Sequence, residues 1–426
     1  MKRILSSILC GVLITGLLGG CGGETGNVGA NAAGTAENES VTEKTQQKGE
    51  PQVIRIWHDG DEAIMETIAE EVNNILADDM VSVQFEKKTG LTDQLQLYGT
   101  DEVNGPDMYF YAHDSLGTFA EMGILAPITD LITEKDEGYL LPMTVEAGTY
   151  QGIQYMLPVY YETLLFIYNQ DLWEGEVPDT TDGLYDYMTA HTDTEAGTYA
   201  VLNQHSTAYN VAPFINGFGG YIINENAKPG LNDAATIEAI TYNQKFAALQ
   251  ADGDYNTINT LFLEQKAAAI IGGPWLISGI NEAGIHYGIK SLSEFTLPNG
   301  EKLAPYSGIQ GVGVLKYAAE NKKDAVSKVL LALCDESVGV ALAQKANCAP
   351  ANQQSYADTD VVDNEMIMAM RETAETAQPM PNIPEMSVMW GPAESLLAAV
   401  NKSGEDVQTA AETYQKEAET AIADMH

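Results

Sequence analysis

The chain of 426 residues has room for two to three domains. Apolar residues make up 45% of it, which permits sizeable cores and excludes global disorder. Its 61 acidic residues outnumber its 21 basic ones, and the formal net charge is −40. Nucleic acid and anionic lipid surfaces should repel such a chain, so we expect no nucleic-acid partner. The chain also has 21 Tyr against 9 Phe, which suits a polar ligand with apolar faces.

Residues 1–20 have the pattern of an export signal. Lys2 and Arg3 form a positively charged start, and an apolar stretch from Ile4 to Leu18 follows, too short for a membrane span. Two glycines then precede Cys21, as in a bacterial lipobox, where the signal is cut before the cysteine and the thiol carries diacylglycerol. We therefore predict lipidation of Cys21, in preference to a plain secretory signal with an incidental cysteine. Two acyl chains give stable anchoring, which places the protein at the extracellular face of the cell membrane.

Residues 21–50 are predicted to be a flexible linker between the lipid anchor and a globular body. They are mainly Gly, Ala, Thr, Asn, Gln and Glu, with almost no large apolar side chain. After cleavage, 19 basic and 61 acidic residues remain, a formal net charge of −42. No later stretch reaches about 18 uninterrupted apolar residues, so we predict no further transmembrane helix.

The globular body begins with a strand–helix–strand pattern. Gln52–Trp57 is rich in β-branched residues and reads as a buried strand. Apolar residues spaced by three and four from Ile64 to Ile75 predict a helix, and alternation from Val81 to Phe85 predicts a second strand. Met108–Ala112 reads as a third. This order predicts a parallel sheet with right-handed crossovers.

The pattern resumes further along the chain. Apolar runs predict strands at Leu164–Tyr168, Ala267–Gly272 and Gly311–Leu315, the second of them after a helix over Asn259–Lys266. Helical spacing of apolar residues from Val407 to Ile422 predicts a C-terminal helix. A body of this length exceeds what one core usually holds, so we predict two α/β lobes.

Two cysteines remain in the globular body. Residues 335–345, between Cys334 and Cys348, read as a short helix, which would place the two sulfurs at its opposite ends. That separation exceeds the spacing that a disulfide allows. We therefore expect two buried thiols without a disulfide.

The search for catalytic and metal-binding motifs finds one near-match. None of the six histidines forms a zinc-binding pair, and no P-loop or nucleophile elbow occurs. Asp252, Asp254 and Asn256 match three positions of a calcium loop, but Thr257 replaces its glycine and Glu264 falls one place late. The mismatch favours a loop in which Asn256 or Thr257 caps the next helix. We expect no metal, no cofactor and no catalytic residue.

Acidic and aromatic side chains follow three of the predicted strands. They are Asp59, Asp61 and Glu62, then Tyr111 and Asp114, then Tyr161 and Glu162. In open α/β sheets ligands bind at the carboxyl ends of strands. Helix capping could explain Asp61 alone, but it does not explain a cluster that recurs at three places.

Five motifs in order resemble bacterial extracellular solute-binding proteins of carbohydrate ABC importers, over residues 51–425. They are Ile56–Asp61 (IWHDGD), Gly105–Asp114 (GPDMYFYAHD), Phe166–Leu172 (FIYNQDL), Gly273–Trp275 (GPW) and Met380–Ser387 (MPNIPEMS). The second and last are similar to the maltodextrin-binding branch of that family. The resemblance implies a monomeric receptor that delivers malto-oligosaccharides, linear α-1,4-glucans, to the transmembrane subunits of an ABC permease.

The resemblance also implies a two-lobed fold of periplasmic-binding-protein type, each lobe a mostly parallel sheet with flanking helices, which closes on a sugar by a hinge. The implied boundaries follow from the family alignment. Lobe 1 comprises residues 51–160 and 312–358, lobe 2 comprises residues 165–306 and 366–426, and the hinge crossings are residues 161–164, 307–311 and 359–365.

The ligand-binding residues that the resemblance implies are aromatic platforms and carboxylate acceptors. Aromatic rings suit a pyranose because its faces carry C–H groups, and charged acceptors bond its hydroxyls strongly. The full set is Asp59, Asp61, Glu62, Tyr111, Asp114, Glu162, Tyr209, Trp275, Met380 and Trp390. Trp57, at the end of an apolar strand, is predicted to be core instead.

Several positions depart from the family pattern. Glu62 stands where the family has Lys, Ser115 and Glu394 replace Arg, Thr207 replaces Glu, and Gly391 replaces a Tyr beside Trp390. Lost donors change which sugar hydroxyls are read, so another oligosaccharide stays an alternative ligand. Two alternatives of other classes also stay open: a glycoside hydrolase using the carboxylates, and a surface adhesin for intact starch.

Overall fold

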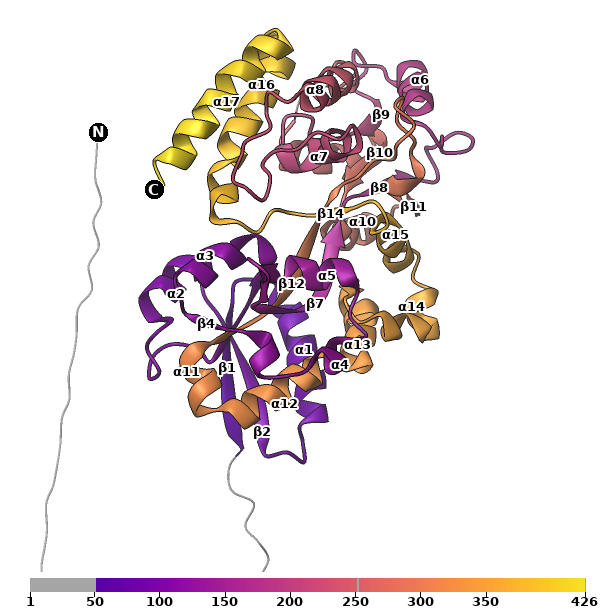
Figure 1. Ribbon diagram of the computed structural model, residues 1–426. Helices are drawn as coiled ribbons and strands as arrows, with labels where there is room; N and C mark the ends of the chain where they lie inside the picture. The colour runs from indigo at the N-terminus through magenta and orange to yellow at the C-terminus, as the bar shows by residue number, and fades with distance from the viewer. Residues whose placement is uncertain (1–50, 251–252, 426) are drawn as a thin grey trace, which may run out of the picture. The chain divides into compact units, whose positions relative to one another are not determined.

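The computed structural model describes residues 51–250 and 253–425, which belong to one compact unit (Figure 1). The predicted signal peptide, Cys21 and the linker at residues 21–50 lie outside the described residues. Over the part of the chain that is described, none of the helices has the length and apolar character that crossing a membrane requires.

The first sheet has eight strands. Its order is β13-β7-β12-β3-β1-β2, and β4 and β14 also pair with β12. The bounds are β1 (Gln52–His58), β2 (Val81–Lys87), β3 (Met108–Ala112), β4 (Leu125–Ala126), β7 (Met156–Thr163), β12 (Tyr306–Leu315), β13 (Ala349–Pro350) and β14 (Gln378–Pro379). Its central strands are buried on both faces. Ile54 and Ile56 of β1, and Val312 and Val314 of β12, enter one core. Trp57 of β1 and Leu315 of β12 enter the other core, because successive side chains of a strand point to opposite faces.

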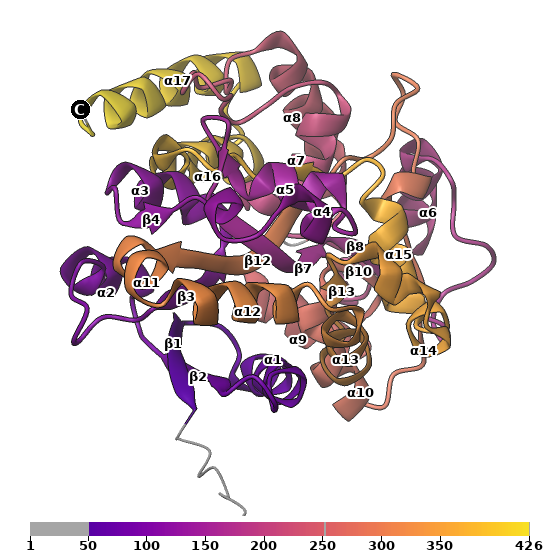
Figure 2. The same cartoon turned by 60° about the horizontal axis from the view of Figure 1, so that its bottom comes forward.

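Helices cover both faces of this sheet. α1 and α12 pack on β2, and α1 also packs on α13 (Figure 2). These helices cover the face of Ile54 and Ile56, whereas α2 and α3 share a core with Trp57 on the other face. The helices of this part are α1 (Glu62–Ile75), α2 (Leu91–Tyr98), α3 (Leu116–Glu121), α4 (Glu134–Glu137), α5 (Pro142–Ala147), α11 (Lys316–Asn321), α12 (Lys323–Leu333), α13 (Glu336–Ala346) and α14 (Thr359–Val362). A two-stranded hairpin of β5 (Thr149–Tyr150) and β6 (Ile153–Gln154) lies beside α3 and α5.

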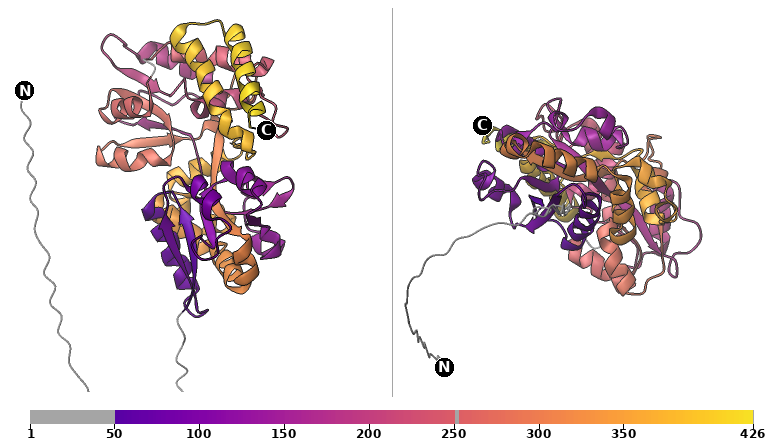
Figure 3. Two further views of the ribbon diagram at one scale, coloured as in Figure 1. Left: turned by 90° about the vertical axis from the view of Figure 1, so that its left-hand side faces the viewer. Right: turned by 90° about the horizontal axis from the view of Figure 1, so that it is seen from below.

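The second sheet has four strands in the order β11-β8-β10-β9. They are β8 (Leu165–Asn169), β9 (Tyr199–Leu202), β10 (Ala267–Gly272) and β11 (Tyr287–Lys290). Its helices are α6 (Thr181–His191), α7 (Ala208–Gly217), α8 (Ala234–Ala247), α9 (Tyr255–Leu263), α10 (Ile277–Glu282), α16 (Trp390–Ser403) and α17 (Val407–Ala423). α16 and α17, the yellow pair in Figures 1 and 3, pack together and against α8.

α15 (Glu365–Thr373) packs against strands of both sheets, namely β7 and β13 of the first and β8 and β11 of the second. β7 and β8 are separated by a single residue, Leu164, and β12 is the strand by which the chain returns to the first sheet after β11 of the second. The chain therefore passes between the two sheets in extended segments.

Both sheets are mixed, which corrects the expectation of mostly parallel sheets. β1 pairs in parallel with β2 and β3, as the strand–helix–strand pattern predicts, and β9 pairs in parallel with β10. β12, however, runs antiparallel to β3 and β7, and β8 runs antiparallel to β10 and β11. Apolar periodicity carries no information on direction, which depends on where a distant strand returns.

Most of the individual elements match their predictions, and one helix boundary does not. α9 begins at Tyr255 instead of Asn259, because the Asp254 carboxylate accepts from the Thr257 N–H and caps the helix there. Asn256 and Thr257 lie inside the helix, so the predicted caps are wrong; Asp252 lies outside the described residues. Cys334 and Cys348 form no disulfide, Cys348 is buried, and Cys334 is only half-buried. Trp57 is core, as predicted.

Candidate functional site

A cavity of about 660 Å³ lies where the carboxyl ends of β1 and β3 face the segment after β10. The first-sheet side contributes residues from the β1–α1 loop, β3, β7, β12 and the end of α13. The second-sheet side contributes residues that follow β10. The lining residues are Asp59, Gly60, Asp61, Ala63, Ile64, Tyr111, Ala112, Tyr160, Glu162, Pro274, Trp275, Ile277, Ser278, Asn281, Gln310, Lys345, Ala346 and Asn347.

The loop after β1 brings two carboxylates to the cavity. Asp61 caps α1, and one of its carboxylate oxygens accepts from the N–H groups of Ala63 and Ile64. This fixes the turn that also carries Asp59. Burial raises the pKa of Asp59, and a hydrogen bond with the Tyr111 side chain acts against that shift. Asp61 therefore both caps α1 and lines the cavity, so the two interpretations of this residue are compatible.

Glu162 is the most perturbed carboxyl group of the cavity. It stands on β7 opposite Gly308 of β12, between the strongly buried Tyr161 and Thr163. Burial raises its pKa to about 7, because no cation is close enough to offset the loss of hydration. Lys345 is the one cation among the described lining residues, and it pairs with Glu70 and Glu71 at 2.9 and 3.4 Å.

Trp275 is the aromatic side chain that the opposite wall presents. It belongs to a short 3-10 helix, Pro274–Leu276, directly after β10. A Cβ on Gly273 would stand 2.2 Å from the indole, so a side chain at this position would displace the ring from where it lies. The side chain is 43% exposed. Part of the aromatic surface of Trp275 is therefore open to solvent at the cavity.

A group of three aromatic side chains, Tyr209, Tyr306 and Trp390, lies near the carboxylates of Glu162 and Asp114. The Tyr306 ring is 6.4 Å from that of Tyr209 and 6.5 Å edge-on from that of Trp390. Burial and then the charges of Glu162 and Asp114 raise the pKa of the Tyr209 hydroxyl, which places Tyr209 close to both carboxylates. The pKa of Asp114 is itself raised by burial. Tyr209 and Asp114 thus lie close to Glu162 without lining the cavity, and Trp390 belongs to the same aromatic group through Tyr306.

Two predicted site residues line other cavities. Glu62 lies on the first turn of α1 and faces a hollow with His58 and Lys87. Met380 follows β14 and lines a groove with Tyr150 and Asn382. The structure thus brings Asp59, Asp61, Tyr111, Glu162 and Trp275 into one cavity, and it places Asp114, Tyr209 and Trp390 beside it.

Sequence reasoning missed several polar residues of the cavity. Gln310 lies on β12 within a predicted hinge crossing, and Asn281 lies on α10 six residues after Trp275. Asn347 ends α13 in the left-handed conformation, with a φ of 53°. The signal for Asn347 was present, because asparagine is a common left-handed helix cap. No local signal marks Gln310, because it reaches the cavity only through the antiparallel pairing of β12 with β7.

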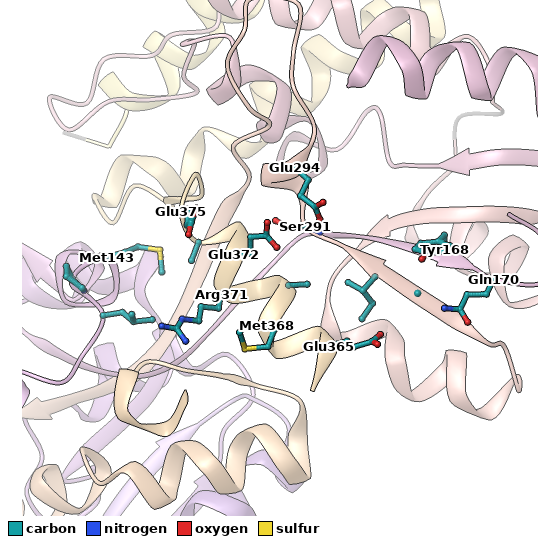
Figure 4. Close-up of a pocket in the computed structure, with 16 residues that line it drawn as sticks. Met143, Tyr168, Gln170, Ser291, Glu294, Glu365, Met368, Arg371, Glu372 and Glu375 are labelled. Carbon is teal, nitrogen blue, oxygen red and sulfur yellow. Dashed lines mark hydrogen bonds between the residues drawn. The ribbon is translucent and has the colours of Figure 1, made fainter. Parts of the chain in front are cut away.

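A second cavity, of about 850 Å³, lies elsewhere, between α15, β8, β11 and the start of α5 (Figure 4). Glutamates dominate its polar lining: Glu294, Glu365, Glu372 and Glu375. Burial, and then the charges of Glu294 and Glu375, raise the pKa of Glu372. Its rim offers no exposed indole, and it has no strand carboxyl ends from the first sheet, so it lacks the features of the 660 Å³ cavity.

The fold is that of a solute-binding protein. Residues 64–369 match the family described as bacterial extracellular solute-binding protein. This match covers well over half of the chain, and the chain belongs to that family.

Three of the curated relatives similar to this chain are named as oligosaccharide-binding proteins. The maltotriose-binding protein of Pyrococcus abyssi is 29% identical over 376 residues, 85% of this chain and 81% of the relative. Maltodextrin-binding protein MdxE of Bacillus subtilis is 31% identical, and the match covers 78% of this chain and 84% of the relative. The galactooligosaccharide-binding protein of Bacillus subtilis is 27% identical, and that match covers 94% of this chain and 96% of the relative.

A solved structure supports the same fold. The maltose-binding periplasmic protein of Listeria monocytogenes, in complex with maltose, superposes with a TM-score of 0.78 and 26% identity, covering 89% of this chain and all of that one. This chain therefore has the two-lobed α/β fold of periplasmic binding proteins, with mixed sheets and flanking helices.

Proposed function

We propose that this protein is the lipid-anchored receptor of an ABC importer and that it binds malto-oligosaccharides in the 660 Å³ cavity. One observation carries the proposal: the half-exposed Trp275 lines the same cavity as three carboxylates, Asp59, Asp61 and Glu162. An aromatic platform opposite hydrogen-bond acceptors matches a pyranose, which has C–H groups on its faces and hydroxyls at its edges. Trp390, Tyr209 and Asp114 would extend this site when the two lobes close on the sugar.

The receptor role adds a hinge and an anchor. We place lobe 1 at residues 51–160 and 312–358, lobe 2 at residues 165–306 and 366–426, and the hinge at the three segments between them. Lipidated Cys21 would hold the body at the extracellular face, from which it delivers sugar to the permease subunits as a monomer. Growth with a labelled fatty acid should label the wild type and leave Cys21→Ala unlabelled, and equal labelling of the two would overturn the anchor.

The ligand is tested by calorimetry on the purified lipid-free chain. The panel contains maltose, maltotriose, longer maltodextrins, isomalto-oligosaccharides, xylo-oligosaccharides and galacto-oligosaccharides. We expect saturable binding of the linear α-1,4-glucans, and weaker or no binding of the others. A preference for any other sugar of the panel would reject maltodextrin as the ligand and keep the receptor.

Galacto-oligosaccharides are the alternative ligand with an observation in their favour. The relative of that name covers 94% of this chain, a larger share than the two maltodextrin-related relatives cover. The departures at Glu62, Ser115 and Gly391 also remove donors and a ring that the maltodextrin branch uses. The panel therefore contains both sugar classes at matched chain lengths.

A glycoside hydrolase is the second candidate function. A hydrolase needs one carboxylic acid with a raised pKa, and the pKa of Glu162 is raised to about 7. The relatives, however, are named as binding proteins, and a buried carboxyl group also results from a cleft built to hold a neutral ligand. Incubation with maltoheptaose decides between the two, because shorter products in excess of the protein concentration would establish hydrolysis.

A further inference from the structure

His113 is buried beside the candidate site and bonds to two distant chain segments. The side chain is inaccessible to solvent. Its Nδ1 lies 3.1 Å from the backbone N of Ile309, and its Nε2 lies 2.9 Å from the carbonyl oxygen of Met380. A backbone N–H can only donate and a carbonyl can only accept, so Nδ1 carries no proton and Nε2 carries one. Burial lowers the pKa of His113 to about 4, so the ring is neutral at pH 7.

The imidazole joins three segments: two carry predicted ligand-binding residues, and the third pairs with the strand that carries Glu162. His113 itself follows β3, between Tyr111 and Asp114. Ile309 lies on β12, where its neighbour Gly308 pairs with Glu162. Met380 is a predicted contact in its own right, and its terminal methyl lies 3.8 Å from where a Cβ on Gly308 would stand.

The segment from Met380 to Asn382 is fastened further to elements around the first sheet. The Gly117 N–H donates to the Asn382 carbonyl at 2.8 Å. The Asn382 amide donates to the carbonyls of Ala147 and Thr149 at 3.0 and 2.8 Å. A few residues later Met386 and Met389 enter the core around the second sheet. The segment is therefore anchored on one side of the molecule immediately before it crosses to the other.

We propose that His113 is a positioning residue of the sugar site. Without touching the ligand, it holds Asp114, the β12 strand opposite Glu162, and Met380 in fixed positions relative to one another. This inference rests on the proposed function. Each of its two hydrogen bonds satisfies a backbone group whose alternative is an unpaired, buried polar atom. Loss of the ring nitrogens would let β12 and the Met380 segment shift relative to Asp114. A sugar whose hydroxyls are bound by groups on all three segments would then bind less tightly.

His205 provides a matched control. His205 is also buried, and burial also lowers its pKa to about 4. Its Nδ1, however, bonds to the side chain of Asn243 on α8 instead of to a distant backbone segment of the site. Replacing either histidine with phenylalanine keeps a planar ring and removes both nitrogens. Both variants should lose stability, while only the His113 variant has a reason to lose sugar affinity.

The test compares the full chain with His113→Phe, His113→Gln and His205→Phe at a temperature where each is folded, using maltotetraose as the probe. We expect at least a tenfold weaker Kd for His113→Phe and an unchanged Kd for His205→Phe. We expect partial recovery in His113→Gln, whose amide can again donate to Met380. Wild-type affinity in folded His113→Phe, or equal losses in the two phenylalanine variants, would overturn the positioning role.

A second measurement keeps the inference falsifiable if His113→Phe does not fold. Nitrogen-15 NMR of the full chain labelled at histidine should show, without sugar, one neutral ring with the proton on Nε2 and slow exchange. A protonated His113 at pH 7, or a proton on Nδ1, would overturn the bonding that the inference requires. If the wild type binds no sugar of the panel while this NMR signature is present, the proposed function fails and the positioning role fails with it, although the bonding itself stands.

Discussion

At the scale of single residues, Glu162 shows how the site is balanced between burial and binding. Its carboxyl group is raised to a pKa of about 7 by desolvation, with no cation to oppose the shift. A sugar hydroxyl that donates to the ionised carboxylate would favour the charged form and lower this pKa in the complex. Glu162 thus gives up its proton when ligand binds, so affinity is linked to pH.

We predict that sugar affinity rises as the pH is raised from about 5 to about 7 and levels off above it. Below pH 7 free Glu162 is protonated, and binding must release that proton; above pH 7 it is already ionised, so the linkage ends. Calorimetry in buffers of different ionisation enthalpy measures both the affinity and the proton release. Glu162→Gln should bind with a flat pH profile.

Glu372→Gln is the control for this profile. The pKa of Glu372 is also raised by burial, but the residue lines the 850 Å³ cavity away from the sugar site. Its substitution should leave the profile unchanged. Affinity that falls between pH 5 and pH 7 would mean that Glu162 binds the sugar in its protonated form, as a donor.

Trp275 allows binding to be separated from stability at one residue. Because its side chain is 43% exposed in the sugar-free protein, Trp275→Ala should change the melting temperature little. It should weaken sugar binding by at least tenfold, about 1.4 kcal/mol, because the stacking face is lost. Calorimetry and thermal melts of one preparation measure both quantities.

Trp173→Ala is the matched control for Trp275→Ala. Trp173 is 8% exposed and belongs to the core around the second sheet. Its truncation should cost about 3–5 kcal/mol of unfolding free energy and leave the sugar affinity of the folded protein unchanged. If the two variants showed the same pattern, Trp275 would be a structural residue and the ligand would bind elsewhere.

At the scale of elements, the register of β3 depends on the buried carboxylate that precedes it. Asp107 is inaccessible to solvent and accepts from the backbone N–H of Arg55 on β1 at 2.9 Å and from Lys322 Nζ at 2.7 Å. Its backbone also bonds to Arg55 and to Leu315 at the end of β12. This one residue therefore ties together β1, which leads into Asp59, and the strands that carry Tyr111 and Gln310.

We predict that Asp107→Ala destabilises the protein by about 3 kcal/mol or more, because it leaves Lys322 and the Arg55 N–H without their buried acceptor. Urea unfolding measures the difference. Asp79→Ala, at the exposed pair with Lys328, should cost at most about 1 kcal/mol. Comparable losses in both variants would show that the buried pair is no stronger than a surface one.

Local patterns were sufficient to predict β1, β2, β3, β10 and α17, because each buries a face whose period is visible within the element. The start of α9 was missed because Asp254 and Asn256 are both capable caps, and only the geometry chooses between them. Strand direction was missed at β8 and β12, since pairing over more than 100 residues leaves no local trace.

The candidate site could be predicted where it follows a local rule. Asp59, Asp61 and Tyr111 stand at the ends of parallel strands, and the cavity lies there. Trp275 could be singled out only through the family motif, since a tryptophan after two glycines and a proline has no intrinsic preference for a cavity. His113 was passed over because a histidine between an aromatic and a carboxylate has no motif of its own, and its two partners are 196 and 267 residues away.

At the scale of the whole molecule, the dominant quantity is the net charge of −40. Few of these carboxylates belong to the site, and most lie on the surface among only 21 basic residues. Self-repulsion of this size destabilises the compact state while it keeps the protein soluble. A neutral sugar carries no charge to be attracted or repelled, so the same field should hardly act on binding.

We predict that stability and affinity respond differently to salt. Raising NaCl from about 20 mM to about 500 mM shortens the screening length from more than 10 Å to a few ångström, so the melting temperature should rise as repulsion is screened. The Kd for maltotetraose should change by less than twofold, because binding of a neutral ligand releases no counterions and its hydrogen bonds form inside the cavity. Thermal melts and calorimetry across the series test both statements on one preparation. An affinity that falls steeply with salt would show that the ligand is a cation attracted by the acidic cavity, and the sugar proposal would then be wrong.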